Sequence, residues 1–243
     1  MRKKVLITMM IAVCILSGNG MVYYQHNDKN RQTEQSSETE EMLNQDIVET
    51  KDSEYYAYID EKNPKTVQIG NKKTGKEFSI QINDKEERVN AVVELEWISD
   101  VELGILSHID PSVSYFCVYN AKQKTFFDEK YGVHFQWVKN DESTLIYAVA
   151  SPHFSKEKGY EVVKNQKDEI LYTTEQDEEI AELALSPNGE EIAMLLWNRK
   201  TDSNELVMMK RNGTDIQRKT IGEYPDKFYW QSDAVLVVGK EYY

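Results

Sequence analysis

Cysteine and basic residues are scarce in this sequence of 243 residues, which has two cysteines and 29 lysines and arginines against 42 acidic residues. Cys14 lies in an apolar run near the N-terminus and Cys117 in a predicted strand, so the two cannot form a disulfide within one folded domain. We expect Cys117 to be a small buried hydrophobic residue rather than a reactive thiol, because its neighbours Phe116 and Val118 would not lower its pKa.

The deficit of basic residues gives the chain a formal net charge of -13 at pH 7. A surface of this sign repels phosphate backbones and anionic lipid headgroups. It therefore argues against nucleic-acid binding and against membrane adsorption through a basic patch. The charge favours a cationic protein or peptide as the partner.

Motifs of the common catalytic folds are also missing. The sequence has no GxSxG nucleophile elbow, no HExxH zinc motif, no GxxxxGK[ST] phosphate loop and no sialidase-type aspartate box. The many acidic residues offer carboxylates for glycoside hydrolysis, but a pair can be chosen only from geometry. We therefore predict no catalytic residue, no cofactor and no metal site.

Glycine is outnumbered by the aromatic residues that suit strands, with eleven glycines against 15 tyrosines and four tryptophans. Because aromatic side chains pack well on a pleated surface, this composition predicts an all-β fold. The length and the hydrophobic content of 40% are enough for one domain with a core.

Residues 1–24 form a predicted membrane segment. Basic residues at positions 2–4 precede an apolar run at 5–16, and the next ionisable Asp, Glu, Lys, Arg or His comes after Tyr24. An uncharged window of this length can span a bilayer, and the basic residues would stay in the cytoplasm. The rest of the chain would then lie at the outer face of a bacterial-type cytoplasmic membrane.

A cleaved signal peptide is the alternative for this segment, because Gly18 and Gly20 offer small residues before Met21. The protein would then be secreted. Lipoprotein processing at Cys14 is not expected, since Val13 is too large for the position before a lipidated cysteine.

Residues 25–54 are predicted to be a disordered polar linker. Gln, Asn, Glu, Asp, Ser and Thr dominate this stretch, which cannot bury enough apolar surface to offset its chain entropy. A short amphipathic helix at 40–48 is the alternative. The remaining residues, 55–243, form the predicted folded domain.

Two patterns repeat within this domain, and the first is a hairpin centred on asparagine. An apolar strand, an asparagine, a Lys-rich or Gly-containing turn and a second strand recur at intervals of 45 to 49 residues. Asparagine tolerates the left-handed backbone conformation that a tight turn needs. The four asparagines are Asn71, Asn120, Asn165 and Asn212.

The second pattern alternates with the first. A large apolar residue is followed within three residues by Asp or Asn, and then by an apolar strand. These large residues are Trp97, Trp137, Leu185 and Trp230. Their shared position in the repeat predicts that the three indole rings pack between neighbouring sheets.

Repeats of 40 to 49 residues with about four short strands each are typical of β-propeller blades. The segment LALSPNGEEIAML at 183–195 is similar to the Ser-Pro-Asp-Gly-Lys-x-Ile-Ala motif of the TolB-like, WD40-like β-propeller family, with Asn188 in place of the usual Asp. The resemblance covers about residues 55–239 and implies an architecture, not an activity.

The blade count stays open between four and five. Residues 55–60 are predicted to be the second strand of a blade that lacks its first strand, and 227–231 an extra first strand. Pairing the two would close a ring of four blades but leave 234–239 as an additional strand. An open or incomplete ring of five blades is an alternative, as is a two-sheet sandwich.

We expect the binding face at two inter-strand segments that are long for a blade, 107–114 and 151–159. A metal site within them is not expected, because a zinc ion needs at least three protein ligands. His134 is expected to be packed or hydrogen-bonded. The candidate binding residues are His108, Asp110, His153 and Phe154.

The combined prediction is a small or incomplete propeller of four-stranded antiparallel sheets that binds or scaffolds a partner outside the membrane without catalysis. Two alternatives belong to other classes. One is a secreted glycan-active enzyme on a small propeller. The other is a sensor or immunity protein that captures a cationic peptide.

Overall fold

The structure is a computed structural model that describes residues 46–52, 54–139, 141–150 and 160–243. Every regular element in these residues is a strand, so the all-β prediction is confirmed. Among the described residues no helix is long and apolar enough to cross a membrane. The predicted membrane segment and most of the predicted linker lie outside the described residues.

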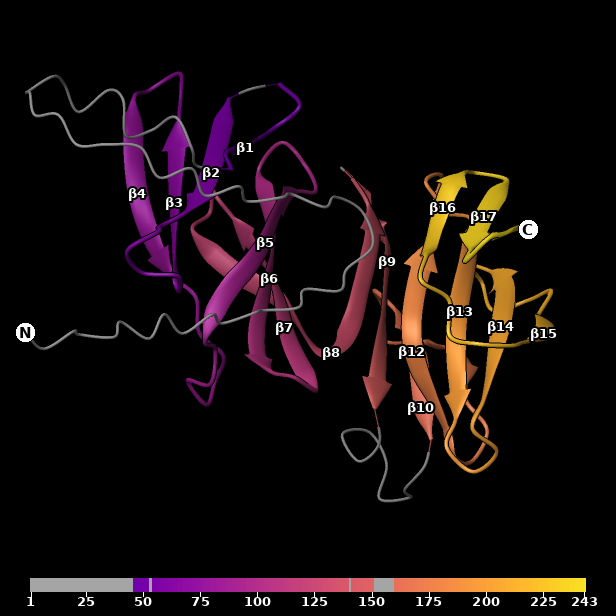
Figure 1. The fold of residues 1–243 in the computed structure, drawn as a ribbon. Coiled ribbons are helices and arrows are strands. Elements are labelled where there is room, and N and C mark those ends of the chain that lie inside the picture. Colours follow the sequence, from indigo (N-terminus) through magenta and orange to yellow (C-terminus); the bar gives the residue numbers. More distant parts are fainter. Residues whose placement is uncertain (1–45, 53, 140, 151–159) are drawn as a thin grey trace, which may run out of the picture.

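The strands form antiparallel sheets that follow the order of the chain (Figure 1). The first sheet contains β1 (Val48–Glu49), β2 (Tyr55–Ile59), β3 (Thr66–Asn71) and β4 (Lys76–Gln81). The second contains β5 (Ala91–Trp97), β6 (Glu102–Asp110), β7 (Val113–Asn120), β8 (Thr125–Val138), β9 (Asp141–Ala150), β10 (Glu161–Asn165) and β11 (Ile170–Thr173). The third contains β12 (Glu178–Leu185), β13 (Glu191–Asn198), β14 (Ser203–Lys210) and β15 (Gln217–Ile221). The last contains β16 (Phe228–Ser232), β17 (Val235–Val238) and β18 (Glu241–Tyr242).

The seven-stranded sheet consists of two blades that share β8. The first part of β8, up to Gly132, pairs with β7, and the second part, from Val133, pairs with β9. His134 has a φ of 54° at this change of partner, where the register of pairing shifts. We therefore number five blades: β1–β4, β5 to early β8, late β8 to β11, β12–β15 and β16–β18.

The fifth blade has three strands where the others have four. β2 and β16 belong to different sheets, so the closed ring of four blades does not form. The substantial packing contacts between sheets join consecutive blades, which Figure 1 shows in a row from blade 1 to blade 5. The prediction of an incomplete propeller is confirmed, and the alternative of a two-sheet sandwich is wrong.

The first strand of blade 1 lies inside the segment predicted to be a linker. Val48 pairs with Ala57, and the backbone N–H of Thr50 donates to the carbonyl of Tyr55 at 3.0 Å. The indole Nε1 of Trp97 in blade 2 donates to the carbonyl of Val48 at 3.1 Å. The folded domain therefore starts before residue 55.

The asparagine hairpins are confirmed, but the asparagines act differently from the prediction. Each lies at the end of the third strand of its blade or, for Asn212, two residues after it, and its Oδ1 accepts backbone N–H groups of the following turn. The left-handed conformation belongs instead to a later residue of each turn. These residues are Gly75, Lys124 and Asp168, with φ of 64°, 58° and 64°, and in the turn after Asn212 both Gly213 and Asp215, with φ of 81° and 55°.

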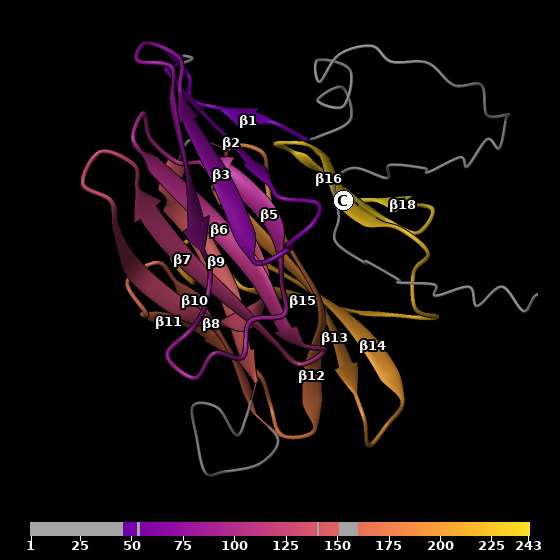
Figure 2. The ribbon, with the colours of Figure 1, turned by 90° about the vertical axis from the view of Figure 1, so that its left-hand side faces the viewer.

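The core consists of hydrophobic clusters between consecutive blades. Figure 2 shows the blades from the side of blade 1, with the later blades behind it. Trp97 is buried between blades 1 and 2, and Trp230 between blades 4 and 5. Leu185 lies between blades 3 and 4. Trp137 is half-buried against the cluster of blades 2 and 3, with its ring 5.6 Å from that of Phe116. The predicted packing of the indole rings is therefore confirmed.

Candidate functional site

The prediction of a long loop at 107–114 is wrong. Residues 107–110 continue β6, β7 begins at Val113, and only Pro111 and Ser112 form the turn. The Asp110 carboxylate accepts the backbone N–H and the hydroxyl of Ser112, both at 2.7 Å. These bonds favour a tight turn, which a Pro-Ser pair between strands also favours.

The other predicted site residues fall into different places. His108 lies on β6, paired with Ala91 and Ser114. His153 and Phe154 lie outside the described residues. No group of three or more His, Cys, Asp and Glu side chains in the described part of the chain is arranged to hold a metal.

Cys117 and His134 have the structural environments expected from the sequence. Cys117 is buried, and this burial raises the pKa of its thiol to about 12, so the thiolate is not formed at neutral pH. Burial also lowers the pKa of His134, although a hydrogen bond to the backbone of Ile180 in blade 4 opposes the change.

A cleft of about 680 Å³ lies between blades 3 and 4, within the roughly 300–1,000 Å³ of small-ligand sites. We call it the blade 3–4 cleft. Blade 3 lines it with the start of β9 and the turn between β10 and β11, and blade 4 with the turns that precede β13 and follow β14. Its residues are Ser143, Leu145, Ile146, Asn165, Gln166, Lys167, Glu169, Leu171, Glu190, Lys210, Arg211 and Asn212.

The blade 3 wall is a turn that its own polar groups hold in place. The Oδ1 of Asn165 accepts the backbone N–H groups of Lys167 and Glu169, each at 3.0 Å. The Nδ2 of Asn165 donates to the Glu169 carboxylate at 2.7 Å. The amide therefore fixes the turn and leaves the Lys167 ammonium outside this local network.

A buried cation supports the same turn from inside the protein. Asp168 accepts a hydrogen bond from Lys130 Nζ at 2.9 Å and another from the Tyr147 hydroxyl. Lys130 also pairs with Asp128 at 2.8 Å, and only 7% of its side chain is exposed. Blades 2 and 3 are therefore connected at the cleft wall by charge-assisted hydrogen bonds, which are stronger than neutral ones.

The blade 4 wall is attached to blade 3 through Arg211. Its Nη1 donates to the carbonyl of Ser143 at 2.9 Å. Asn212 orders the turn, because its Oδ1 accepts the backbone N–H of Thr214 at 3.1 Å and the Thr214 hydroxyl at 2.7 Å. Lys210 forms an ion pair with Glu191, which raises the pKa of the lysine.

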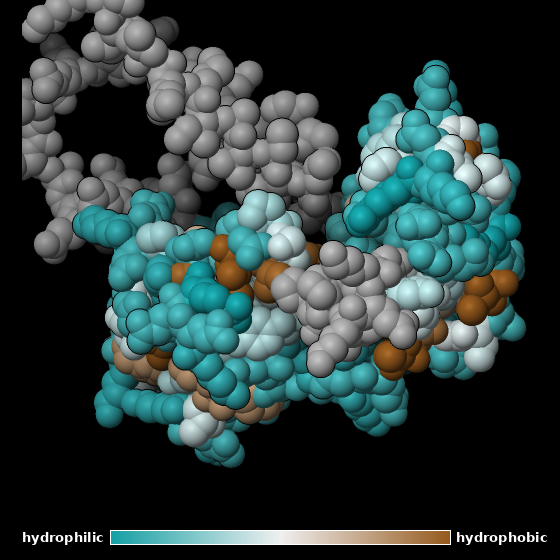
Figure 3. Space-filling view, turned by 90° about the horizontal axis from the view of Figure 1, so that it is seen from below, coloured by the Kyte–Doolittle hydropathy of each residue, from teal (hydrophilic) through white to brown (hydrophobic). Residues whose placement is uncertain are grey.

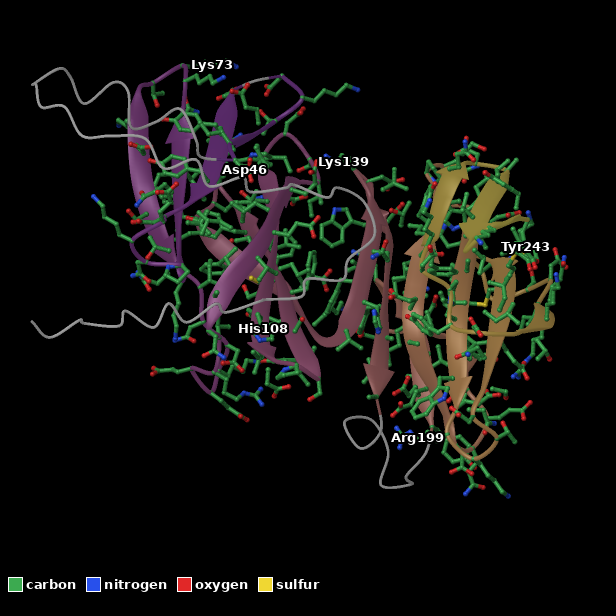
Figure 4. The ribbon with its side chains drawn as sticks, viewed as in Figure 1. Asp46, Lys73, His108, Lys139, Arg199 and Tyr243 are labelled. Carbon is green, nitrogen blue, oxygen red and sulfur yellow. The ribbon has the colours of Figure 1, made fainter. Side chains whose placement is uncertain are left out.

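The cleft and the predicted binding residue His108 lie at opposite ends of the blades. The cleft lies near the start of β9, just after Lys139, which Figure 4 shows at the upper end of the molecule. His108 lies at the lower end in the same view. Seen from below in Figure 3, the coloured surface is largely hydrophilic, and its hydrophobic residues form only small separate patches.

A second polar feature lies on the first strands of the blades. Desolvation by the surrounding protein raises the pKa of Glu94 on β5, although the residue is exposed at the surface, and the charge of Glu96 raises it further. Burial also raises the pKa of Glu96, although Lys139 of the β8–β9 turn lies 3.7 Å away. On β12, burial raises the pKa of Glu182, which accepts a hydrogen bond from the Tyr224 hydroxyl at 3.0 Å.

Sequence reasoning missed the cleft, although part of the signal was present. Asn165 and Asn212 occupy equivalent positions in consecutive repeats, and each is followed or preceded closely by a basic residue, Lys167 or Arg211. Equivalent turns of adjacent blades lie at the same end of a propeller. Their spacing of 47 residues was therefore the available clue to a shared wall.

Comparison with known proteins supports the architecture alone. No protein-family model and no curated protein matches the sequence. An oligogalacturonate lyase from Vibrio parahaemolyticus is similar in structure, with 11% identity and a TM-score of 0.50 over 78% of this chain and 56% of the lyase. The β-propeller domain of the Trilobed protease from Pyrococcus furiosus gives 12% identity and a TM-score of 0.46 over 80% of this chain and 63% of that one.

The Dos1 propeller is a further similar structure, with 10% identity and a TM-score of 0.41 over 74% of this chain and 48% of the other. The chain thus spans between 48% and 63% of the length of these structures. At such identities the likeness shows the fold and nothing of the activity. The chain has a β-propeller fold with an incomplete fifth blade.

Proposed function

We propose that this chain is a non-enzymatic binding or scaffolding module and that the blade 3–4 cleft is its binding site. The observation that supports this proposal is the construction of the cleft. Ordered turns from two blades place ammonium, guanidinium and amide groups around the partly exposed side chain of Leu171, and the cleft is backed by the buried β9 residues Leu145 and Ile146. A concave apolar floor with a few positioned polar groups is the usual composition of a ligand site.

We also propose that the repeats belong to the TolB-like, WD40-like type. The motif at 183–195 forms the hairpin between β12 and β13. Its Ser186 hydroxyl accepts the backbone N–H groups of Glu190 and Glu191, at 3.1 and 2.9 Å, and donates to the Asn188 amide at 2.8 Å. The serine and the asparagine therefore have a turn-ordering role that explains their place in the motif.

The proposed location is the outer face of the cytoplasmic membrane, with residues 1–24 as an anchor. The basic residues at 2–4 and the apolar run at 5–16 support this orientation. A reporter enzyme that is active only outside the cytoplasm, fused after Tyr243, would be active and would sediment with membranes. A second reporter, active only in the cytoplasm, is fused at the same position. Activity of this second reporter would contradict the proposed orientation.

The binding proposal is tested by capture from membranes with the full chain. Cells that produce the full chain are treated with a cross-linker, and the cross-linked proteins are compared between the wild type and the double variant Lys167→Glu, Arg211→Glu. Lys200→Glu is the control, because it makes the same charge change in the turn between β13 and β14, at the other end of blade 4.

The expected result is a specific cross-linked product that the double variant loses and the control keeps. Equal yields from all three proteins would show that the cleft is not the binding site. Thermal unfolding of each purified protein checks that the variants fold.

A glycan-active enzyme is the second candidate, and the neighbouring carboxylates of Glu94 and Glu96 favour it. The two residues lie two positions apart on β5, and the pKa values of both carboxyl groups are raised, which is the direction that a general acid needs. Because one similar structure is an oligogalacturonate lyase, oligogalacturonate is the first substrate to assay. Turnover that Glu94→Gln abolishes would support an enzyme, and no turnover of acidic or neutral glycans would remove this candidate.

A further inference from the structure

The blade 3–4 cleft does not share the strong negative charge of the whole chain. The net charge of the protein is -13, whereas the cleft lining contains Lys167, Lys210 and Arg211 beside two glutamates, Glu169 and Glu190. Lys210 is paired with Glu191, so the charges around the cleft are nearly balanced. Lys167 and Arg211 are the cations that could meet a negatively charged group of a ligand.

Two of these cations have bonding capacity to spare. Lys210 is paired with Glu191, but in the described part of the chain the Lys167 ammonium has no ion-pair partner. Arg211 uses Nη1 for the carbonyl of Ser143, and its remaining N–H groups have no partner among the described residues. A guanidinium has five N–H donors, so most of them stay available for a carboxylate.

The backbone of the turn that carries Lys167 is fixed before any ligand arrives. Asn165 holds the turn from one side, and the ion pair of the buried Lys130 with Asp168 holds it from the other. The guanidinium of Arg211 is itself held across the cleft by its bond to blade 3. A preorganised donor such as Arg211 loses little conformational entropy on binding, which raises the affinity for a ligand that matches it.

The cleft floor distinguishes a peptide from a sugar. Leu171 offers the cleft a partly exposed aliphatic side chain, whereas Leu145 and Ile146 are buried, and no aromatic residue is among the described residues that line the cleft. An aliphatic floor suits an aliphatic side chain, whereas a flat sugar face gains most from an aromatic ring beneath it. The floor therefore favours a peptide that combines acidic and aliphatic residues.

We propose that the blade 3–4 cleft binds an acidic segment of a protein, with carboxylates held by Lys167 and Arg211 and an aliphatic side chain packed on Leu171. This inference rests on the proposed function of the cleft. It differs from the expectation of a cationic partner that the overall charge suggests. The local cations act at contact distance, while the net charge acts mainly through a field that salt screens within about 8 Å.

The test is a titration of the full chain with defined peptides, followed by fluorescence anisotropy at physiological salt. The probe is a labelled peptide in which glutamate alternates with leucine and valine. Matched peptides have glutamine or lysine in place of glutamate, and oligogalacturonate is the acidic sugar. The proteins are the wild type, Lys167→Glu, Arg211→Gln and the control Lys200→Glu.

The glutamate peptide is expected to bind the wild type, and each cleft variant is expected to weaken binding by roughly tenfold or more, because a hydrogen bond to a charged group is lost. The control is expected to change the affinity by less than about twofold. The inference is wrong if the glutamine or lysine peptide binds as tightly as the glutamate peptide, if no peptide binds, or if only oligogalacturonate binds in a manner that depends on Lys167.

The two proposals can fail separately. If the cross-linked product depends on the cleft but the glutamate peptide does not compete for it, the binding function stands and the acidic ligand is wrong. If the product is insensitive to the cleft variants, the cleft itself is not the site. Lys167→Glu is the safer variant, because the Lys167 side chain forms no ion pair within the described residues that its replacement would break.

Discussion

Asp168 is the left-handed residue of its turn, and its carboxylate pairs with the buried ammonium group of Lys130. Burial alone would raise the pKa of its carboxyl, but hydrogen bonds from Tyr147 and Lys130 outweigh burial and lower the pKa. A carboxylate with a lowered pKa stabilises the folded state above its unfolded pKa of about 3.9, and this stabilisation is lost as the pH falls through the folded pKa.

Asp168→Asn is therefore expected to lower the free energy of unfolding by about 1 kcal/mol at pH 7, since the Asp168 side chain is half exposed and solvent weakens its ion pair. Asparagine accepts the φ of 64°, so the change tests the charge rather than the turn. Urea unfolding at pH 7 and at pH 3 measures the difference, which should shrink at pH 3. An equal difference at both pH values would contradict the assignment.

Arg218 has the densest set of ion pairs in the described chain, with Glu175, Glu178 and Glu205. Its Nη2 lies 2.5 Å from the carboxylate of Glu178, whose side chain is only 3% exposed. Arg218→Met would leave that carboxylate buried without its cation, which costs about 3 kcal/mol of unfolding free energy.

The matched control for this change is Arg199→Met. Arg199 pairs with Glu179, and both side chains are substantially exposed, so its loss is expected to cost less than about 1 kcal/mol. The urea midpoints of unfolding of the two variants show which substitution costs more stability. A larger loss for Arg199→Met than for Arg218→Met would show that burial of Glu178 does not govern the cost.

At the level of elements, the hairpin between β12 and β13 touches blade 3 through Gly189. This glycine has a φ of 72°, and a Cβ placed on it would lie 2.8 Å from Thr144 Cγ2. Gly75, in the equivalent backbone conformation with a φ of 64°, has nothing within 4 Å of such a Cβ. Substitution of Gly75 therefore measures the cost of the left-handed backbone alone, and substitution of Gly189 measures that cost together with the clash against blade 3.

Gly75→Ala is expected to cost about 1 kcal/mol of unfolding free energy, the usual penalty of a left-handed conformation for alanine. Gly189→Ala is expected to cost about 1–3 kcal/mol more, because the added methyl group overlaps blade 3. Thermal and urea unfolding of both variants provide the measurement. Equal losses would mean that the hairpin moves away from blade 3 without cost.

Sequence patterns predicted the strands and turns whose residues recur in the repeat. They missed the elements that form only through contact with another part of the chain. Trp97 and Asn120 recur at fixed positions, so the burial of the indole ring and the place of the hairpin follow from the period, although the period did not show that Asn120 acts through its Oδ1. β1 has only the two residues Val48 and Glu49, too short for any pattern, and it is a strand because β2 pairs with it. The cleft was missed because its walls lie on turns 47 residues apart, and their proximity depends on how blades stack.

At the scale of the whole molecule, the terminal blades are expected to be the least protected. Blade 5 has three strands, and its cluster packs against blade 4, so one face and one edge lack the support that blades 2 to 4 receive from both sides. Regions with fewer buried contacts open at lower free energy than the core does.

Hydrogen exchange of the full chain, followed by mass spectrometry, tests this expectation. Peptides from β17 should exchange faster than peptides from β13, whose central residues Ala193 to Leu196 are fully buried. Uniform protection across β13 and β17 would mean that blade 5 is supported by something other than blade 4.

The sharing of β8 by two blades limits where the molecule can bend. Blades 2 and 3 have one continuous 14-residue strand in common, so no linker separates them. Blade 4 is joined to blade 3 by the short connection at 174–177 and by the side chains packed between the two blades. We therefore expect a change in the width of the blade 3–4 cleft to occur by displacement of the last two blades relative to the seven-stranded sheet.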